Sequence, residues 1–60
     1  MKVYLLEIEI EYNGERYITD EGIIYPSKET AQKRGMEIVK NPSEKMKGAV
    51  CYYVTEYELR

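Results

Sequence analysis

Residues 3–14 read Val-Tyr-Leu-Leu-Glu-Ile-Glu-Ile-Glu-Tyr-Asn-Gly, and this stretch decides the fold. From Leu6 onward, apolar and acidic side chains alternate strictly, which is the pattern of a β-strand with one buried and one solvated face. Asn13-Gly14 follows directly and favours a type I′ turn, because both central residues of that turn need positive φ. The stretch therefore predicts a strand over residues 3–12 that turns back on itself as a hairpin.

A two-residue turn fixes the register of the second strand. The predicted pairs are Tyr12 with Glu15, Glu11 with Arg16, Ile10 with Tyr17 and Ile8 with Thr19. Beyond Thr19, the same register would place Asp20 opposite Glu7 and Glu21 opposite Leu6. We therefore expect a bulge or break at residues 20–22, where Gly22 supplies the conformational freedom. Pairing is expected to resume, shifted, at residues 23–25.

Residues 28–40 have the spacing of a helix that begins after Pro26. Ser27 is a favourable N-cap, and an Asn-Pro pair after residue 40 ends the helix. One arc of this helix carries Ala31, Gly35, Ile38 and Val39. Because the first two of these are small, we expect the helix to lie close to the sheet.

The last strand is expected over residues 49–59, which gives the order β-β-α-β. The sequence therefore predicts an α+β fold, with a three-stranded antiparallel sheet in the order 2-1-3 and one helix packed on one face. The helix is expected to cover the face of Leu6, Ile8 and Ile10. All 60 residues are expected to form a single small domain.

The composition restricts the chemistry of the chain. It holds one cysteine and no histidine, so it has no internal disulfide and no ligand set for a zinc site. We therefore expect no metal and no cofactor. A thiol without a partner is typical of a reducing compartment, so a cytoplasmic location is expected. No apolar run approaches the roughly 18 residues that span a membrane, and no membrane association is expected.

Catalysis has few candidates, and we expect no enzyme. Histidine, the usual general base near neutral pH, is absent. Cys51 lies in an uncharged stretch and is interpreted as a small buried residue rather than a reactive thiol. The glutamates at positions 7, 9 and 11 are interpreted as the solvated side of a strand rather than as a metal or acid–base row.

Charge is distributed unevenly around a net value of −2. Residues 1–26 sum to −4, residues 27–48 to +3 and residues 49–60 to −1. An acidic chain is a poor default nucleic-acid binder, since phosphate contacts supply most of that affinity. Lys45 and Lys47, together with exposed tyrosines, nevertheless keep a small nucleic-acid-binding protein open as the alternative function.

The aromatic content and the last strand indicate a contact surface. All seven aromatic residues are tyrosines, which suit a surface with one apolar and one solvated side. Residues 49–55 are uncharged and β-prone, a hazard at an exposed edge. The side chains expected to bind a partner are Val50, Tyr52, Tyr53 and Val54, with Tyr53 shared with the core. One helix covers one sheet face, so the partner is expected on the other face, where Val3, Leu5, Ile18 and Ile24 also fall.

The expected function is therefore a non-catalytic protein-binding module, with a second copy of the chain or a host protein as partner. A homodimer is favoured because a domain of this size is short of core and has no disulfide or metal to compensate.

The stretch Tyr-Pro-Ser-Lys-Glu-Thr-Ala at residues 25–31 resembles the capped helix starts of many small sheet-and-helix proteins. In length and β-β-α-β layout, the chain is similar to small phage-encoded inhibitors of host enzymes, one of which blocks bacterial RNA polymerase. The resemblance implies a phage or mobile-element protein that acts on a host protein, and it transfers no residues.

Overall fold

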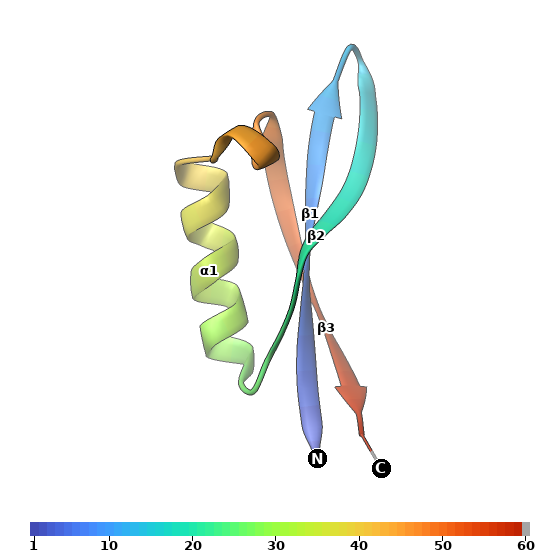
Figure 1. Cartoon of the computed structure of the whole chain (residues 1–60), viewed down its shortest axis with the longest axis vertical. Helices are drawn as coiled ribbons and strands as arrows, with labels where there is room; N and C mark the ends of the chain where they lie inside the picture. The colour runs from blue at the N-terminus through green and yellow to red at the C-terminus, as the bar shows by residue number, and fades with distance from the viewer. Residues whose placement is uncertain (60) are drawn as a thin grey trace.

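The computed structural model describes residues 1–59. Its elements are β1 (Lys2–Tyr12), β2 (Glu15–Tyr25), α1 (Lys28–Lys40), a short 3-10 helix η1 (Glu44–Met46) and β3 (Ala49–Glu58) (Figure 1). The molecule is elongated, with extents of 40 × 19 × 14 Å. The β1–β2 hairpin extends beyond the helix at one end (Figure 1). At the other end, the Leu59 N–H donates a hydrogen bond to the Met1 carbonyl oxygen at 2.7 Å.

The three strands form one antiparallel sheet in the order β2-β1-β3. This confirms the predicted α+β fold, with β1 in the centre. The register from the turn to Ile8–Thr19 is the predicted one. Asn13 and Gly14 both have positive φ, at 52° and 79°, as a type I′ turn requires.

The predicted irregularity in β2 is present, one pair later than expected. Asp20 still lies opposite Glu7, and the next pair is Leu5–Ile24, so three residues of β2 face one residue of β1. Gly22 adopts a φ of 73° there, and its N–H donates to the Asp20 carboxylate at 2.6 Å. Past the bulge, β2 runs toward the start of the helix (Figure 1).

Helix α1 begins and ends at the predicted residues. The Ser27 hydroxyl accepts a hydrogen bond from the Thr30 N–H at 3.2 Å, which caps the N-terminus. The helix buries Ala31, Gly35 and Ile38 against the sheet. The core consists of Leu6, Ile8, Ile38 and Met46, with Ile10, Tyr25, Ala49, Tyr52 and Val54 packed around it. Thus the helix covers the face of β1 that the alternation predicted.

Gly35 sets the distance between helix and sheet. A Cβ on this residue would lie 2.5 Å from Tyr52 Cδ1 and 3.0 Å from Leu6 Cδ1, closer than side-chain atoms pack. The Tyr52 ring therefore rests directly against the helix backbone. The predicted role of a small residue at this position is confirmed.

Candidate interaction surface along β3

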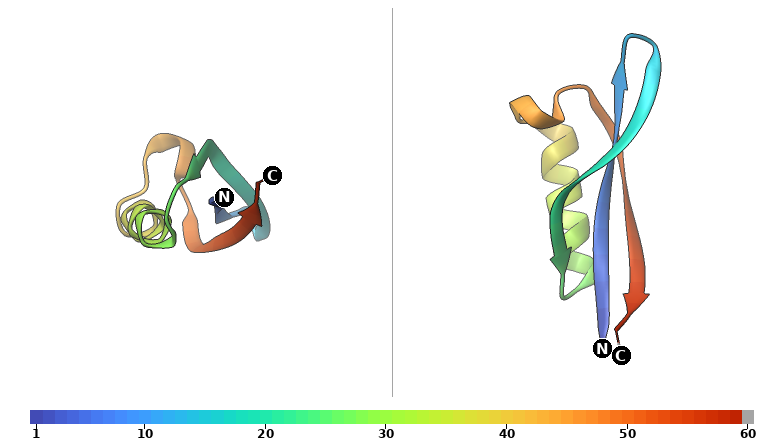
Figure 2. Two further views of the ribbon diagram at one scale, coloured as in Figure 1. Left: turned by 90° about the horizontal axis from the view of Figure 1, so that it is seen from below. Right: turned by 45° about the vertical axis from the view of Figure 1, so that its right-hand side comes forward.

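The sheet has a face that α1 does not cover, on the side opposite Leu6 and Ile8. In Figure 2, the helix lies to one side of the twisted sheet. Alternation along the paired strands defines this open face as Val3, Leu5, Glu7 and Glu9 of β1, Ile18 and Ile24 of β2, and Cys51, Tyr53, Thr55 and Tyr57 of β3. Four of its large apolar side chains are about half exposed: Ile18 at 53%, Ile24 at 56%, Tyr53 at 47% and Tyr57 at 49%.

The four side chains predicted to bind a partner do not share this face. Tyr52 lies opposite Ile8, and Val54 lies opposite Leu6, so both point to the helix side and pack against the core. Tyr53, which was expected to be shared with the core, lies on the open face instead. Val50 lies at a register shift between β1 and β3 and is 44% exposed. The expected placement of Tyr52 and Val54 on the uncovered face is therefore corrected.

The physical reason is that alternation in β3 defines two faces but does not say which one is covered. Both faces of this strand are apolar at first, and no tight turn ties its register to β1. The helix determines which face of β3 is covered, because Gly35 accommodates the ring of Tyr52. The neighbouring Tyr53 must then point the other way.

A polar cluster holds Tyr53 in place on the open face. Its hydroxyl donates to Glu9 Oε1 at 2.7 Å, and Arg16 Nη1 donates to Glu9 Oε2. Arg16 Nη2 also lies 3.5 Å from Glu11 Oε2. The hydrogen bond to Glu9 is the main cause that raises the pKa of Tyr53 to about 12, and the same bond lowers the pKa of Glu9. Glu9, interpreted from sequence as a water-facing residue, is only 13% exposed.

The two edges of the sheet differ in chemistry. The β2 edge is interrupted by the bulge and carries Glu15, Arg16, Asp20 and Glu21, features that oppose pairing with another strand. In β3, by contrast, residues 49–55 carry no charge and no proline. No other strand pairs with the outer side of β3 within residues 1–59. The β3 edge is thus the less charged one, and its own register shift lies at Val50.

Charged residues stand at both ends of this uncharged stretch. Lys45 and Lys47 are exposed in the connector that precedes β3. At the far end, Glu56 lies 3.7 Å from Lys2 Nζ, and Glu58 lies 3.8 Å from the terminal amine; both glutamates are exposed. Lysines therefore precede β3, and two glutamates that lie near cationic groups of the same chain end it.

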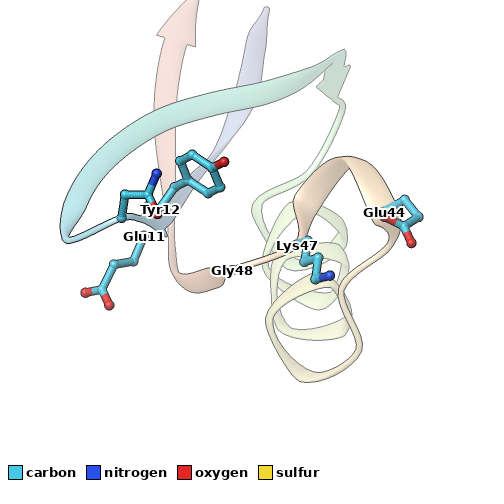
Figure 3. Close-up of a pocket in the computed structure, with 6 residues that line it drawn as sticks. Glu11, Tyr12, Glu44, Lys47 and Gly48 are labelled. Atoms are coloured by element: carbon cyan, nitrogen blue, oxygen red, sulfur yellow. The ribbon is translucent and has the colours of Figure 1, made fainter.

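The two lysines of the alternative nucleic-acid site are not brought together. Lys47 borders a hollow with Tyr12 and Asn13, which it shares with Glu11 and Glu44 (Figure 3). Lys45 borders a different hollow, together with Asp20 and Glu21. Carboxylates accompany each lysine, and like charges on phosphate and carboxylate repel. This geometry gives the lysines no common phosphate-binding surface.

Cys51 is half-buried on the open face, and its thiol lies 3.6 Å from the Tyr52 carbonyl oxygen. Within residues 1–59, no group of three or more His, Cys, Asp or Glu side chains is placed to hold a metal ion. None of the helices described is long and apolar enough to cross a membrane.

A second ion pair, between β2 and α1, was also not predicted from the sequence. Arg34 binds Glu21 in a two-pronged contact, with Nε–Oε1 at 3.1 Å and Nη2–Oε2 at 2.8 Å. This contact lowers the pKa of Glu21 and raises that of Arg34. Glu21 lies in the β2 bulge, so the pair ties the bulge to the helix.

Fold and surface together define a two-layer α+β protein with one helix-covered and one open sheet face. No family model, no curated protein and no solved structure matches the chain.

Proposed function

We propose that this protein is a non-catalytic protein-binding module that forms a homodimer through β3 and the adjoining part of the open face. The observation that carries the proposal is the uncharged edge of β3, which includes the exposed side chains of Val50 and Tyr53. An exposed edge of this kind offers unpaired N–H and C=O groups to another strand. Association along β3 satisfies those groups and removes apolar surface from water.

The small core supports association with a second copy. Only six hydrophobic residues are buried among residues 1–59: Val3, Leu6, Ile8, Ala31, Ile38 and Met46. Domains of this size usually gain stability from disulfides, metals or self-association. Cys51 is the chain's only cysteine, and the chain has no histidine, so self-association is the route that we propose.

We place the dimer in the cytoplasm, because an unpaired thiol is compatible with a reducing compartment. A host protein on the same surface is the competing occupant, and the layout shared with phage-encoded inhibitors supports it. The uncharged β3 edge and the small core favour the second copy.

The test compares two apolar-to-lysine substitutions. Val50→Lys puts a charge on the β3 edge, a common protection against strand pairing, whereas Met36→Lys alters a 60% exposed residue on the helix. Molar mass by light scattering after gel filtration is expected to be twice the 7.1 kDa of the chain for the natural protein and for Met36→Lys, and that of a monomer for Val50→Lys. Equal masses for the two variants would contradict the proposed surface.

A nucleic-acid titration decides the alternative. Binding that uses Lys45, Lys47 and exposed tyrosines would weaken steeply with salt. We expect no binding to a single-stranded oligonucleotide at low salt, because carboxylates lie beside both lysines.

A further inference from the structure

We infer that the dimer contact continues from β3 across the part of the open face where β1 begins and β3 ends, and that the same patch of a second copy covers it. This terminal half of the open face consists of Val3 and Leu5 of β1, Ile24 of β2, and Thr55 and Tyr57 of β3. The inference rests on the proposed function and adds which part of the open face is buried. The partner that it names is a second copy of this chain.

The terminal half is an uncharged patch that spans all three strands. Leu5 lies opposite Ile24 on one side and opposite Thr55 on the other. Val3 lies opposite Tyr57 and is buried. Ile24 and Tyr57, on the two outer strands, are each about half exposed. An edge contact along β3 alone would leave Ile24 in water, because this residue lies on the far strand of the sheet.

The hairpin half of the same face carries charge. Asp20 lies directly opposite Glu7. Packing this half against a second copy would take both carboxylates out of water, which is costly unless each gains a cationic partner. Arg16, the basic side chain of this half, is already bound to Glu9 and Glu11. On β1 and β2, the contact is therefore confined to the terminal half.

The accessible surface of the chain is larger than its mass predicts. A folded monomer of this mass exposes about 4,100 Å², whereas this chain exposes 4694 Å². The difference, roughly 600 Å², is comparable to the roughly 800 Å² that each partner buries in an interface of standard size. The elongated sheet thus exposes nearly as much additional surface as one partner in a dimer covers.

A second copy is the partner that this patch fits. In a two-fold dimer the same patch is used by both copies, so a charge on the patch would lie near the like charge of the partner. The terminal half has no charged side chain, and its two exposed members are Ile24 and Tyr57. Its contact with itself therefore removes apolar surface from water without burying a charge.

Three isoleucines of β2 allow a matched test, since they are exposed to 53% (Ile18), 49% (Ile23) and 56% (Ile24). Ile24 belongs to the terminal half and Ile18 to the hairpin half of the open face. Ile23 points to the other side of the sheet, where it borders a hollow together with Met46. Each isoleucine is replaced by lysine in a separate variant.

Ile24→Lys is expected to weaken the dimer by roughly tenfold or more, because it puts an unpaired charge into the contact. Ile18→Lys and Ile23→Lys are expected to keep the affinity of the natural protein. Sedimentation equilibrium measures the three dissociation constants, and circular dichroism checks that each variant is folded.

The outcomes separate this inference from the proposed dimer. If Val50→Lys is monomeric while Ile24→Lys dimerises like the natural protein, the contact is confined to the edge of β3; the inference then fails and the dimer stands. Equal weakening by Ile18→Lys and Ile24→Lys would overturn the assignment to the terminal half. A monomeric natural protein would overturn both proposals.

Methyl signals of isoleucine in the natural protein test the same patch without a substitution. On dilution through the range in which the dimer dissociates, the nuclear magnetic resonance signal of the Ile24 methyl group is expected to shift. The signals of Ile18 and Ile23 are expected to stay in place. A shift at Ile18, or a constant signal at Ile24 while the measured mass falls from dimer to monomer, would contradict the inference.

Discussion

Gly35 is the residue that brings the helix and the sheet into contact. Its backbone lies against the ring of Tyr52 and the side chain of Leu6. Any side chain at this position must move the ring or lift the helix. Since Tyr52 and Leu6 both belong to the core, the packing of the whole helix-covered face depends on this close approach.

Gly35→Ala is expected to destabilise the protein by about 1–2 kcal/mol, because overpacking outweighs the gain of about 1 kcal/mol in helix propensity. Chemical denaturation measures the effect. The control is the same substitution in a Tyr52→Ala background, where the ring is absent and Gly35→Ala is expected to be neutral or stabilising. A stabilising effect in the natural background would contradict the close packing.

Some of these residue roles follow from sequence, and others do not. The Ser27 cap and the small residue at position 35 are predictable, because both depend on neighbours within one helix. The bond between Tyr53 and Glu9 joins residues 44 positions apart in sequence. Alternation assigns Glu9 to a face but gives no information on its cross-strand neighbour in β3. The sequence pattern alone therefore predicts that Glu9 is solvated.

Glu9→Gln is expected to lower the pKa of Tyr53 from about 12 toward its ordinary value of 10, because the substitution removes the carboxylate that accepts its hydrogen bond. In the natural protein, the hydrogen bond that raises this pKa stabilises the fold fully below pH 10. This contribution is lost as the pH rises through about 12. Ultraviolet titration of tyrosinate measures the shift. The matched control is Glu44→Gln, which has no such contact and is expected to leave the highest tyrosine pKa unchanged.

At the level of elements, the bulge of β2 acts together with helix α1. The two-pronged Arg34–Glu21 contact joins them. Tyr25 at the end of β2 packs against the core, and its pKa is raised, chiefly by burial. The bulge thus lies where β2 leaves the exposed hairpin and approaches α1.

The thermal midpoint of unfolding is expected to depend on pH through Glu21. Its pKa is lowered in the folded protein by Arg34, so the ion pair stabilises the fold above the ordinary value of 4.5. This contribution is lost as the pH falls through the lowered pKa. Glu21→Gln is expected to lower the midpoint at pH 7 and to weaken its decline in acid. A pH profile that is unchanged in this variant would contradict the structural role of the pair.

The hairpin was predictable in detail, whereas the orientation of β3 was not. Asn13-Gly14 fixes the pairing of β1 and β2 by turn geometry alone. Strand β3 follows a helix and a connector, so its register with β1 depends on tertiary packing. Met46, in that connector, is buried at 6% exposure, although its polar neighbours predict a solvated loop. Alternation does not show which face of β3 packs on the helix, and the contact between Tyr52 and Gly35 determines it.

The whole molecule has a short core, an open face and polarised charge. The acidic hairpin extends away from the helix, and the basic connector lies beside the start of β3 (Figure 1). The proposed homodimer, in which β3 of one copy contacts β3 of a second copy, accounts for the short core and the open face together. The dimer then removes the exposed uncharged edge from water.

Sedimentation equilibrium of the natural protein over a wide concentration range tests that proposal most directly. The weight-average mass is expected to rise from 7.1 kDa toward twice that value, and to remain near 7.1 kDa for Val50→Lys under the same conditions. A mass of 7.1 kDa for the natural protein at high micromolar concentration would contradict the proposed dimer.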